Sequence, residues 1–262
     1  MYRLWGIITT EYRMSIRRWG FWIAFGLLST PYLFSILLSM FDSQAGLAYL
    51  SRQEVWQESV YQVYSLNLIL PVFAGIIIAD RIPRDRAGHT TELLHSTPLK
   101  TGEYVLGKYV GSLLSILTPV FFLVALIALL SIANGMPWTS VPAMLVAFIA
   151  LIVPAYAFIA AFSIAVPVLL PLRIYQILFT GYWFWGNYLN WRTFPTLSGT
   201  LLTPNGEFVL EGFFGVLKSA LQPGERMHTS GEAILNLLVL LACVVAVLLS
   251  LNAYLVRQVR DA

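Results

Sequence analysis

Long stretches without a charged residue dominate the chain. The longest lies between Lys108 and Arg173 and holds 64 residues, which as a helix would extend about 96 Å. Because the hydrocarbon core of a bilayer is only about 30 Å thick, this stretch predicts at least two membrane crossings. The segment Asn134-Gly135-Met136-Pro137 marks the break between them, since glycine and proline end a helix and begin a turn.

Four further uncharged stretches are each long enough to cross the bilayer. Together they predict an all-α polytopic membrane protein, a single transmembrane domain over residues 1–262 with six transmembrane helices. Composition agrees, because 58% of the residues are hydrophobic and 11% are charged, against about 25% charged in soluble domains. The expected spans are 19–41, 59–79, 109–133, 143–166, 174–191 and 233–256.

Two segments outside the spans complete the expected architecture. Residues 1–18 have apolar side chains at helical spacing and predict an interfacial elbow helix, with a plain juxtamembrane anchor as the alternative. The outer segment 192–232 is too long for a turn and predicts a short amphipathic or re-entrant helix after Thr203-Pro204-Asn205-Gly206, which could equally pack on another subunit.

Basic residues predict the orientation of the spans. Of the 16 lysines and arginines, twelve fall on one side of the expected topology and four on the other, so the positive-inside rule places both termini in the cytoplasm. The twelve are Arg3, Arg13, Arg17, Arg18, Arg81, Arg84, Arg86, Lys100, Lys108, Arg173, Arg257 and Arg260.

The sequence lacks the signatures of several other functions. No Asp, Glu, Lys, Arg or His lies inside an expected span, which disfavours a carrier driven by a proton or sodium gradient. There is no HExxH helix and no Cys/His cluster for a metal, and the net charge of +3 does not indicate nucleic acid. Gly102-Glu103-Tyr104-Val105-Leu106-Gly107-Lys108 resembles a phosphate-binding loop, but Tyr109 replaces its Ser or Thr. We expect no enzyme activity and no cofactor in this chain.

The loop 80–108 is the densest polar segment. It carries five basic and four acidic residues, a balance that argues against simple lipid binding. Thr90 or Thr91 could cap a short helix through Glu92-Leu93-Leu94, which Pro98 would end. Leucines exposed on such a helix indicate a protein partner, whereas the simpler interpretation is a solvated hairpin.

Residues 84–108, RDRAGHTTELLHSTPLKTGEYVLGK, resemble the inner loop of ABC-2 export permeases, the membrane subunits of certain ATP-binding-cassette transporters. The order of elbow, six spans, inner termini and long outer segment is also similar. The positions that match are Arg84, Asp85, Gly88, Glu92, Leu93, Leu94, Ser96, Thr97, Pro98, Tyr104, Gly107 and Lys108.

This resemblance implies a permease of a bacterial or archaeal cytoplasmic membrane that pairs with a second permease, identical or related, and with two ABC ATPase subunits. ATP and Mg would bind to the partner ATPase, and export as the direction rests on the resemblance alone. The alternatives are a membrane scaffold that recruits a cytosolic protein without transport and, more remotely, a gradient-driven carrier. The implied ATPase contacts are Arg84, Asp85, Gly88, Glu92, Leu93, Leu94, Thr97 and Pro98.

The expected fifth span holds eight aromatic residues among 18 positions. Phe179, Tyr182 and Trp183 share one helical stripe by i, i+3, i+4 spacing, and they are the candidate substrate path for an apolar or amphipathic cargo. The alternative is an aromatic belt at the outer membrane interface, which would account for Trp183, Trp185, Tyr188 and Trp191 without a substrate.

Overall fold

The computed structural model describes residues 2–42, 51–88, 100–189, 193–217 and 226–261, and every regular element within these ranges is helical. This confirms the expected all-α class for the described part of the chain. The helices are α1 (Tyr2–Ile16), α2 (Trp19–Asp42), α3 (Arg52–Ser65), α4 (Leu70–Ile78), α5 (Arg81–Ala87), α7 (Thr101–Ala133), α8 (Ser140–Ala147), α9 (Val153–Ala165), α10 (Leu172–Tyr188), α11 (Glu207–Phe214) and α12 (Ser230–Asp261).

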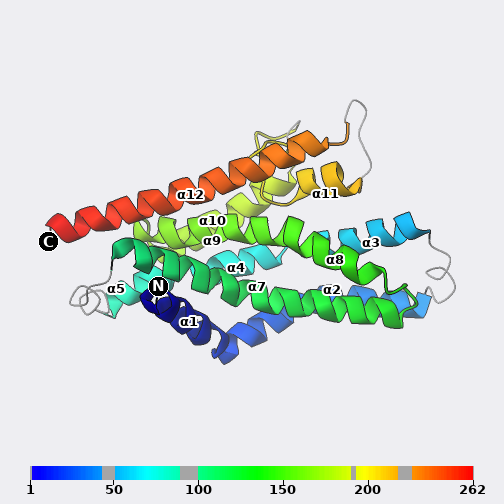
Figure 1. The fold of residues 1–262 in the computed structure, drawn as a ribbon, viewed down its shortest axis with the longest axis horizontal. Coiled ribbons are helices and arrows are strands. Elements are labelled where there is room, and N and C mark those ends of the chain that lie inside the picture. Colours follow the sequence, from blue (N-terminus) through cyan, green and yellow to red (C-terminus); the bar gives the residue numbers. More distant parts are fainter. Residues whose placement is uncertain (1, 43–50, 89–99, 190–192, 218–225, 262) are drawn as a thin grey trace.

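The long helices run side by side as an elongated bundle (Figure 1). Five helical segments of the described chain are long and apolar enough to cross a membrane. They are Trp19–Leu38, Arg52–Ala87, Thr101–Ala133, Ser140–Val168 and Ser230–Gln258. Helix α10 covers most of the expected fifth span, 174–191. It has 17 residues, about 26 Å, and is not among the five segments.

One end of the bundle gathers the end of α5, the start of α7 and the C-terminal end of α12, and α1 lies nearby (Figure 1). We call it the loop end. Helix α1 packs against the first half of α7 because glycines on α7 leave no side chain in the way. A Cβ added at Gly111 would lie 2.9 Å from the carbonyl oxygen of Ile8, and one at Gly107 would lie 2.6 Å from the Ile7 side chain.

The second membrane segment is longer than the expected 59–79 span and is broken in the middle. It begins with a capping box between Ser51 and Glu54, ends its first helix at Ser65 and resumes at Leu70. Pro71 lies in the first turn of α4. Proline has no N–H, and its ring clashes with the carbonyl four residues earlier, so α3 does not continue into α4.

Proline also shapes the fourth segment. Between α8 and α9 lies a π-helical turn, Phe148–Ile152, followed by Pro154 at the start of α9. At the other end α9 passes into a short 3₁₀ helix, Val166–Val168, that contains Pro167. The sequence predicts this bend before Arg173 from the prolines at 167 and 171.

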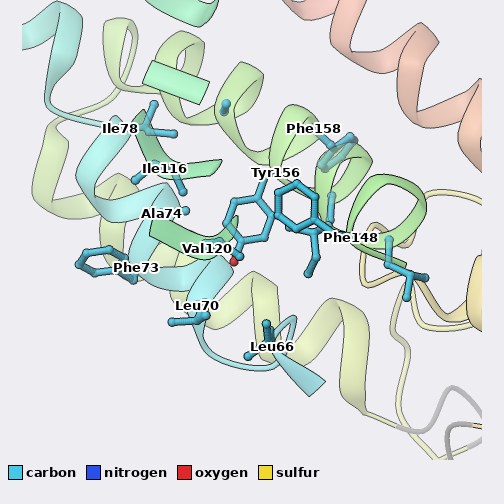
Figure 2. Packing of buried hydrophobic residues seen from close by; sticks show 14 of the residues in the cluster. Leu66, Leu70, Phe73, Ala74, Ile78, Ile116, Val120, Phe148, Tyr156 and Phe158 are labelled. Atoms are coloured by element: carbon cyan, nitrogen blue, oxygen red, sulfur yellow. The ribbon is translucent and has the colours of Figure 1, made fainter. Parts of the chain in front are cut away.

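The core lies where α4, α7 and α9 meet. Tyr156 of α9 is fully buried, and Figure 2 shows its ring pointing toward Ala74, Leu70 and Val120, which belong to α4 and α7. Contact between α4 and α9 holds the part of the second segment that follows the break against the fourth segment.

Helix α11 belongs to the outer segment. Glycines with positive φ bound it, Gly206 at 88° and Gly215 at 64°, a conformation that residues with a Cβ rarely adopt. It packs on α12 and α3 and buries Phe208, Val209 and Leu210.

Candidate functional site

The first candidate region is a buried group of charges at the loop end. The Lys108 ammonium of α7 contacts the Glu11 carboxylate of α1 and lies 2.6 Å from Asp85 Oδ2 of α5. Tyr104 donates its hydroxyl to the same Asp85 oxygen at 2.8 Å. Since Glu11 is 1% exposed and Lys108 4% exposed, one cation holds two carboxylates from two helices inside the protein.

Arg81 extends this group toward the second segment. Its guanidinium is 1% exposed and lies 3.8 Å from Glu11 Oε2 and 3.7 Å from Asp80 Oδ1. Arg18 and Arg84 also face Asp80, at 3.6 and 3.4 Å. Arg18, Asp80 and Arg84 are partly exposed, but Glu11, Arg81 and Lys108 are buried. Because a buried charge is unfavourable unless it has a partner, the positions of α1, α5 and α7 depend on one another. We call this set, Glu11, Arg18, Asp80, Arg81, Arg84, Asp85 and Lys108, the charge cluster.

A cavity of about 620 Å³ opens beside the charge cluster, between α1, α5 and the start of α7. Three of the residues implied as ATPase contacts, Arg84, Asp85 and Gly88, line it, together with Glu11 and Lys108. The other implied contacts, Glu92, Leu93, Leu94, Thr97 and Pro98, lie outside the described residues, as does the short helix expected there.

The second region is the break between α3 and α4. In a continuous helix the Asn67 carbonyl would accept from the N–H of residue 71, which Pro71 lacks. The Tyr188 hydroxyl of α10 donates to that carbonyl at 2.7 Å. The next carbonyl, that of Leu68, accepts from the indole N–H of Trp183 at 3.0 Å, because the N–H of Val72 bonds to Ile69 instead.

Amide side chains continue this network into the outer segment. Asn67 donates to the Asn205 carbonyl at 3.0 Å, and Asn205 donates to the Asn187 carbonyl at 3.1 Å. Tyr32 of α2 accepts from the N–H of Ile69 at 3.3 Å. In these hydrogen bonds the groups that tie the break to α2, α10 and the turn before α11 are neutral.

The third region is an apolar cavity of about 380 Å³ between α9, α10, α12 and the outer segment. Two residues of the expected substrate path line it: Phe179 and Tyr182, beside Tyr175 and Cys243. Phe179 stacks on Tyr175 with ring centres 5.7 Å apart. Its ring also covers Gly75 of α4, where an added Cβ would lie 2.1 Å from it.

Trp183 does not line this cavity. It is fully buried between α10 and the α3–α4 break, where its indole serves the Leu68 carbonyl. The expected stripe therefore divides, with Tyr182 at the cavity and Trp183 in the interior. Of the residues that the belt interpretation would use, Trp185 is 42% exposed, Tyr188 bonds to the break, and Trp191 lies outside the described residues.

Sequence reasoning missed two features of these regions. Glu11 is the acidic residue of the expected elbow, and its i+4 spacing from Ile7 and i+3 spacing from Ile8 placed it near the apolar face, a signal that it has a buried partner. Pro71 inside an expected span was a signal of the break.

Within the described ranges no group of three or more His, Cys, Asp and Glu side chains is placed to hold a metal ion. No curated protein and no solved structure matches the chain. The family model described as ABC-2 family transporter protein matches residues 5–178, which span α1 to the middle of α10 and include all the residues of the charge cluster. The chain belongs to the ABC-2 transporter family.

Membership explains the composition and the fold together. An ABC-2 protein with several long apolar helices is a multi-pass membrane permease that takes part in transport. The match covers two of the three regions only in part, because Asn187, Tyr188, Asn205 and the α12 side of the apolar cavity follow residue 178.

Proposed function

We propose that this ABC-2 protein is the permease subunit of an ATP-driven exporter, paired with a second permease and with two cytoplasmic ATPase subunits. In this proposal the loop 80–108 receives the movement of the ATPases, the helices form the substrate pathway, and ATP and Mg bind only to the partners.

The observation that carries this proposal is the charge cluster. Asp85 precedes the loop residues 89–99 and Lys108 follows them, and the two are paired at 2.6 Å. Both ends of the loop are thus joined to each other and, through Glu11, to α1. A force on the loop would move α5, α7 and α1 as one unit. Helix α5 directly follows α4, the half of the second segment that comes after the break, so α4 would be moved as well.

The loop is tested by Glu92→Arg and Leu94→Asp in the assembled complex. Either change places an unfavourable charge at the proposed ATPase contact, so we expect substrate-stimulated ATP hydrolysis to be lost while the permease remains inserted. Glu58→Arg, on an exposed position of α3 at the opposite end of the bundle, is the matched control. Wild-type stimulation in both loop variants would contradict coupling, and retention of a cytosolic partner without ATP dependence would favour a scaffold.

We also propose six crossings, with α10 as the short fifth span and both termini in the cytoplasm. The twelve-to-four division of basic residues supports this, as does the position of the C-terminal end of α12 at the same end of the bundle as α5 and the start of α7 (Figure 1). In a Cys243→Ala background, cysteines at positions 43 and 219 should react with an impermeant thiol reagent added to intact cells, and one at 101 should not. Labelling at position 101 in intact cells would contradict the proposed orientation.

For the substrate we propose that the apolar cavity with Phe179 and Tyr182 forms part of the path. Tyr182→Ala should lower the apparent affinity for cargo, measured from cargo-stimulated ATP turnover, by about five- to a hundredfold. This is the effect expected for the loss of one aromatic contact, and expression should be unchanged. Trp185→Ala, an exposed aromatic on the same helix, is the control. An unchanged dependence on cargo in Tyr182→Ala would remove this cavity from the path.

A further inference from the structure

A second apolar cavity continues the first toward the loop end. It has about 430 Å³ and lies between α9, the 3₁₀ helix Val166–Val168 and α12. Phe162 and Val166 line both cavities, so the two form one groove along α12. We call it the α12 groove.

The length of the α12 groove matches one leaflet of a bilayer. Its lining on α12 runs from Cys243 to Tyr254, a rise of about 16 Å, and half of a hydrocarbon core is about 15 Å. Leu197 and Leu202 of the outer segment line its other end, and Asn236 holds that segment by donating to the Leu201 carbonyl at 2.9 Å. The groove therefore begins near the middle of α12 and extends to the loop end.

Polar and cationic groups lie where the groove reaches the loop end. Arg86 donates to the Val168 carbonyl at 3.4 Å and to Gln258 at 2.7 Å, and Gln258 donates to the Tyr254 hydroxyl at 2.9 Å. Val168 and Tyr254 line the groove. Arg257 is exposed and follows Tyr254 by three residues, which places it on the same face of α12 one turn further.

An apolar groove one leaflet long with a cationic end has the shape and charge of a phospholipid site. We propose that the α12 groove binds an anionic glycerophospholipid of the cytoplasmic leaflet, with an acyl chain between α9 and α12 and the phosphate near Arg86 and Arg257. The choice of leaflet rests on the proposed orientation, whereas the site itself does not require transport or an ATPase.

Native mass spectrometry of the full-length protein, titrated with dioleoyl phosphatidylglycerol and with dioleoyl phosphatidylcholine, tests the site. We expect one phosphatidylglycerol to bind about fivefold more tightly than phosphatidylcholine, because the choline ammonium offsets the phosphate charge of the second lipid, whereas an arginine attracts the net negative charge of the first. Arg257→Gln should abolish that preference. Arg52→Gln, an exposed arginine at the opposite end of the bundle (Figure 1), should keep it.

The acyl-chain part is tested by a matched pair on α12. Val247→Phe places a ring in the groove and should weaken both lipids, whereas Val245→Phe adds the same ring on the exposed face and should weaken neither. Equal binding of the two lipids by the wild type, or no effect of Val247→Phe, would overturn the proposal.

Two other occupants are distinguished in the same study. If glycerophosphoglycerol without chains competes as well as the whole lipid, the site recognises a free phosphate and the proposal fails. If Ser250→Cys in a Cys243→Ala background forms a disulfide between two copies, a second permease covers the groove and the proposal fails. A reversed topology in the labelling experiment would change only the leaflet from which the lipid comes. Failure of the proposed orientation is therefore distinguishable from failure of the lipid site.

Discussion

The broken second segment and the charge cluster solve the same physical problem with different chemistry. At the break the unpaired carbonyls of Asn67 and Leu68 accept from a tyrosine hydroxyl and an indole. At the loop end, Glu11, Arg81 and Lys108 are buried as ions. Neutral donors satisfy backbone groups at membrane depth at little cost, whereas charges are tolerated where their partners and water are near. The polar groups that the fold admits therefore differ between the middle of the bundle and its loop end.

The two regions also differ in how they would respond to force. The charge cluster joins α1, α5 and α7, so the elements around it move together. The break separates α3 from α4, and each half has its own neighbours: α3 packs on α8, and α4 packs on α9 and α10. The two halves of the second segment are therefore held by different neighbours, and the hydrogen bonds at the break join them to α2 and α10.

The largest effect should come from removing the shared cation of the charge cluster. Lys108→Met removes the ammonium that Glu11 and Asp85 share, while Arg81 still lies 3.8 Å from Glu11; removing one partner of a buried ion pair destabilises a protein by about 3–5 kcal/mol. We expect a clear fall in the thermal unfolding temperature in detergent. Lys100→Met, an exposed lysine at the start of the same helix, should leave it unchanged, and equal effects of the two changes would mean that the cluster is not buried in solution.

The packing that assembles the charge cluster gives the next prediction. Gly111→Ala would place a Cβ 2.9 Å from the Ile8 carbonyl oxygen and 2.7 Å from Glu11 Cβ, so α1 must shift, at a cost of about 1–3 kcal/mol. Gly102→Ala on the same helix meets its nearest atom at 3.6 Å and should be neutral or slightly stabilising. Thermal unfolding compares the two, and a tolerated Gly111→Ala would show that α1 is not held against α7.

At the break we expect a similar cost without any charge. Trp183→Phe keeps an aromatic side chain but removes the donor of the Leu68 carbonyl and shrinks a fully buried ring, which together should destabilise the protein by about 1–3 kcal/mol. Trp185→Phe, with an exposed indole, is the control. Because no charged group takes part, the cost at Trp183 should not depend on salt, and a salt-dependent change would show that charges contribute at the break.

The smallest effect tests the reason for the break itself. Pro71→Ala restores an N–H that is able to bond to the Asn67 carbonyl, so that carbonyl no longer depends on Tyr188. Tyr188→Phe should therefore cost about 1 kcal/mol less in the Pro71→Ala background than in the wild type. Additive effects in this double-mutant cycle would indicate that Pro71 does not create the need for the tyrosine hydroxyl.

The limits of sequence reasoning appear at particular residues. The helical class and the approximate places of the apolar helices follow from charge-free runs, because a bilayer requires long apolar segments with internal hydrogen bonds. The residues of the loop 80–108 were recognisable as a polar segment, but its charges were expected in water. Arg81 and Lys108 are buried instead, and both face Glu11. The sequence did not reveal this, because Glu11 lies 70 and 97 positions away from them.

By itself, the sequence determined the class of protein, the approximate places of the long apolar helices and the uneven distribution of charge along the chain, since these depend on local composition and on the fixed thickness of a membrane. Only the tertiary structure decided that Trp183 serves a carbonyl rather than the cavity, that Tyr182 faces an apolar cavity and that α1 is part of the charge cluster. Each of these outcomes depends on which helices pack against each other. Helical periodicity predicts the face of the helix on which a side chain lies, but it does not predict which helix packs on that face.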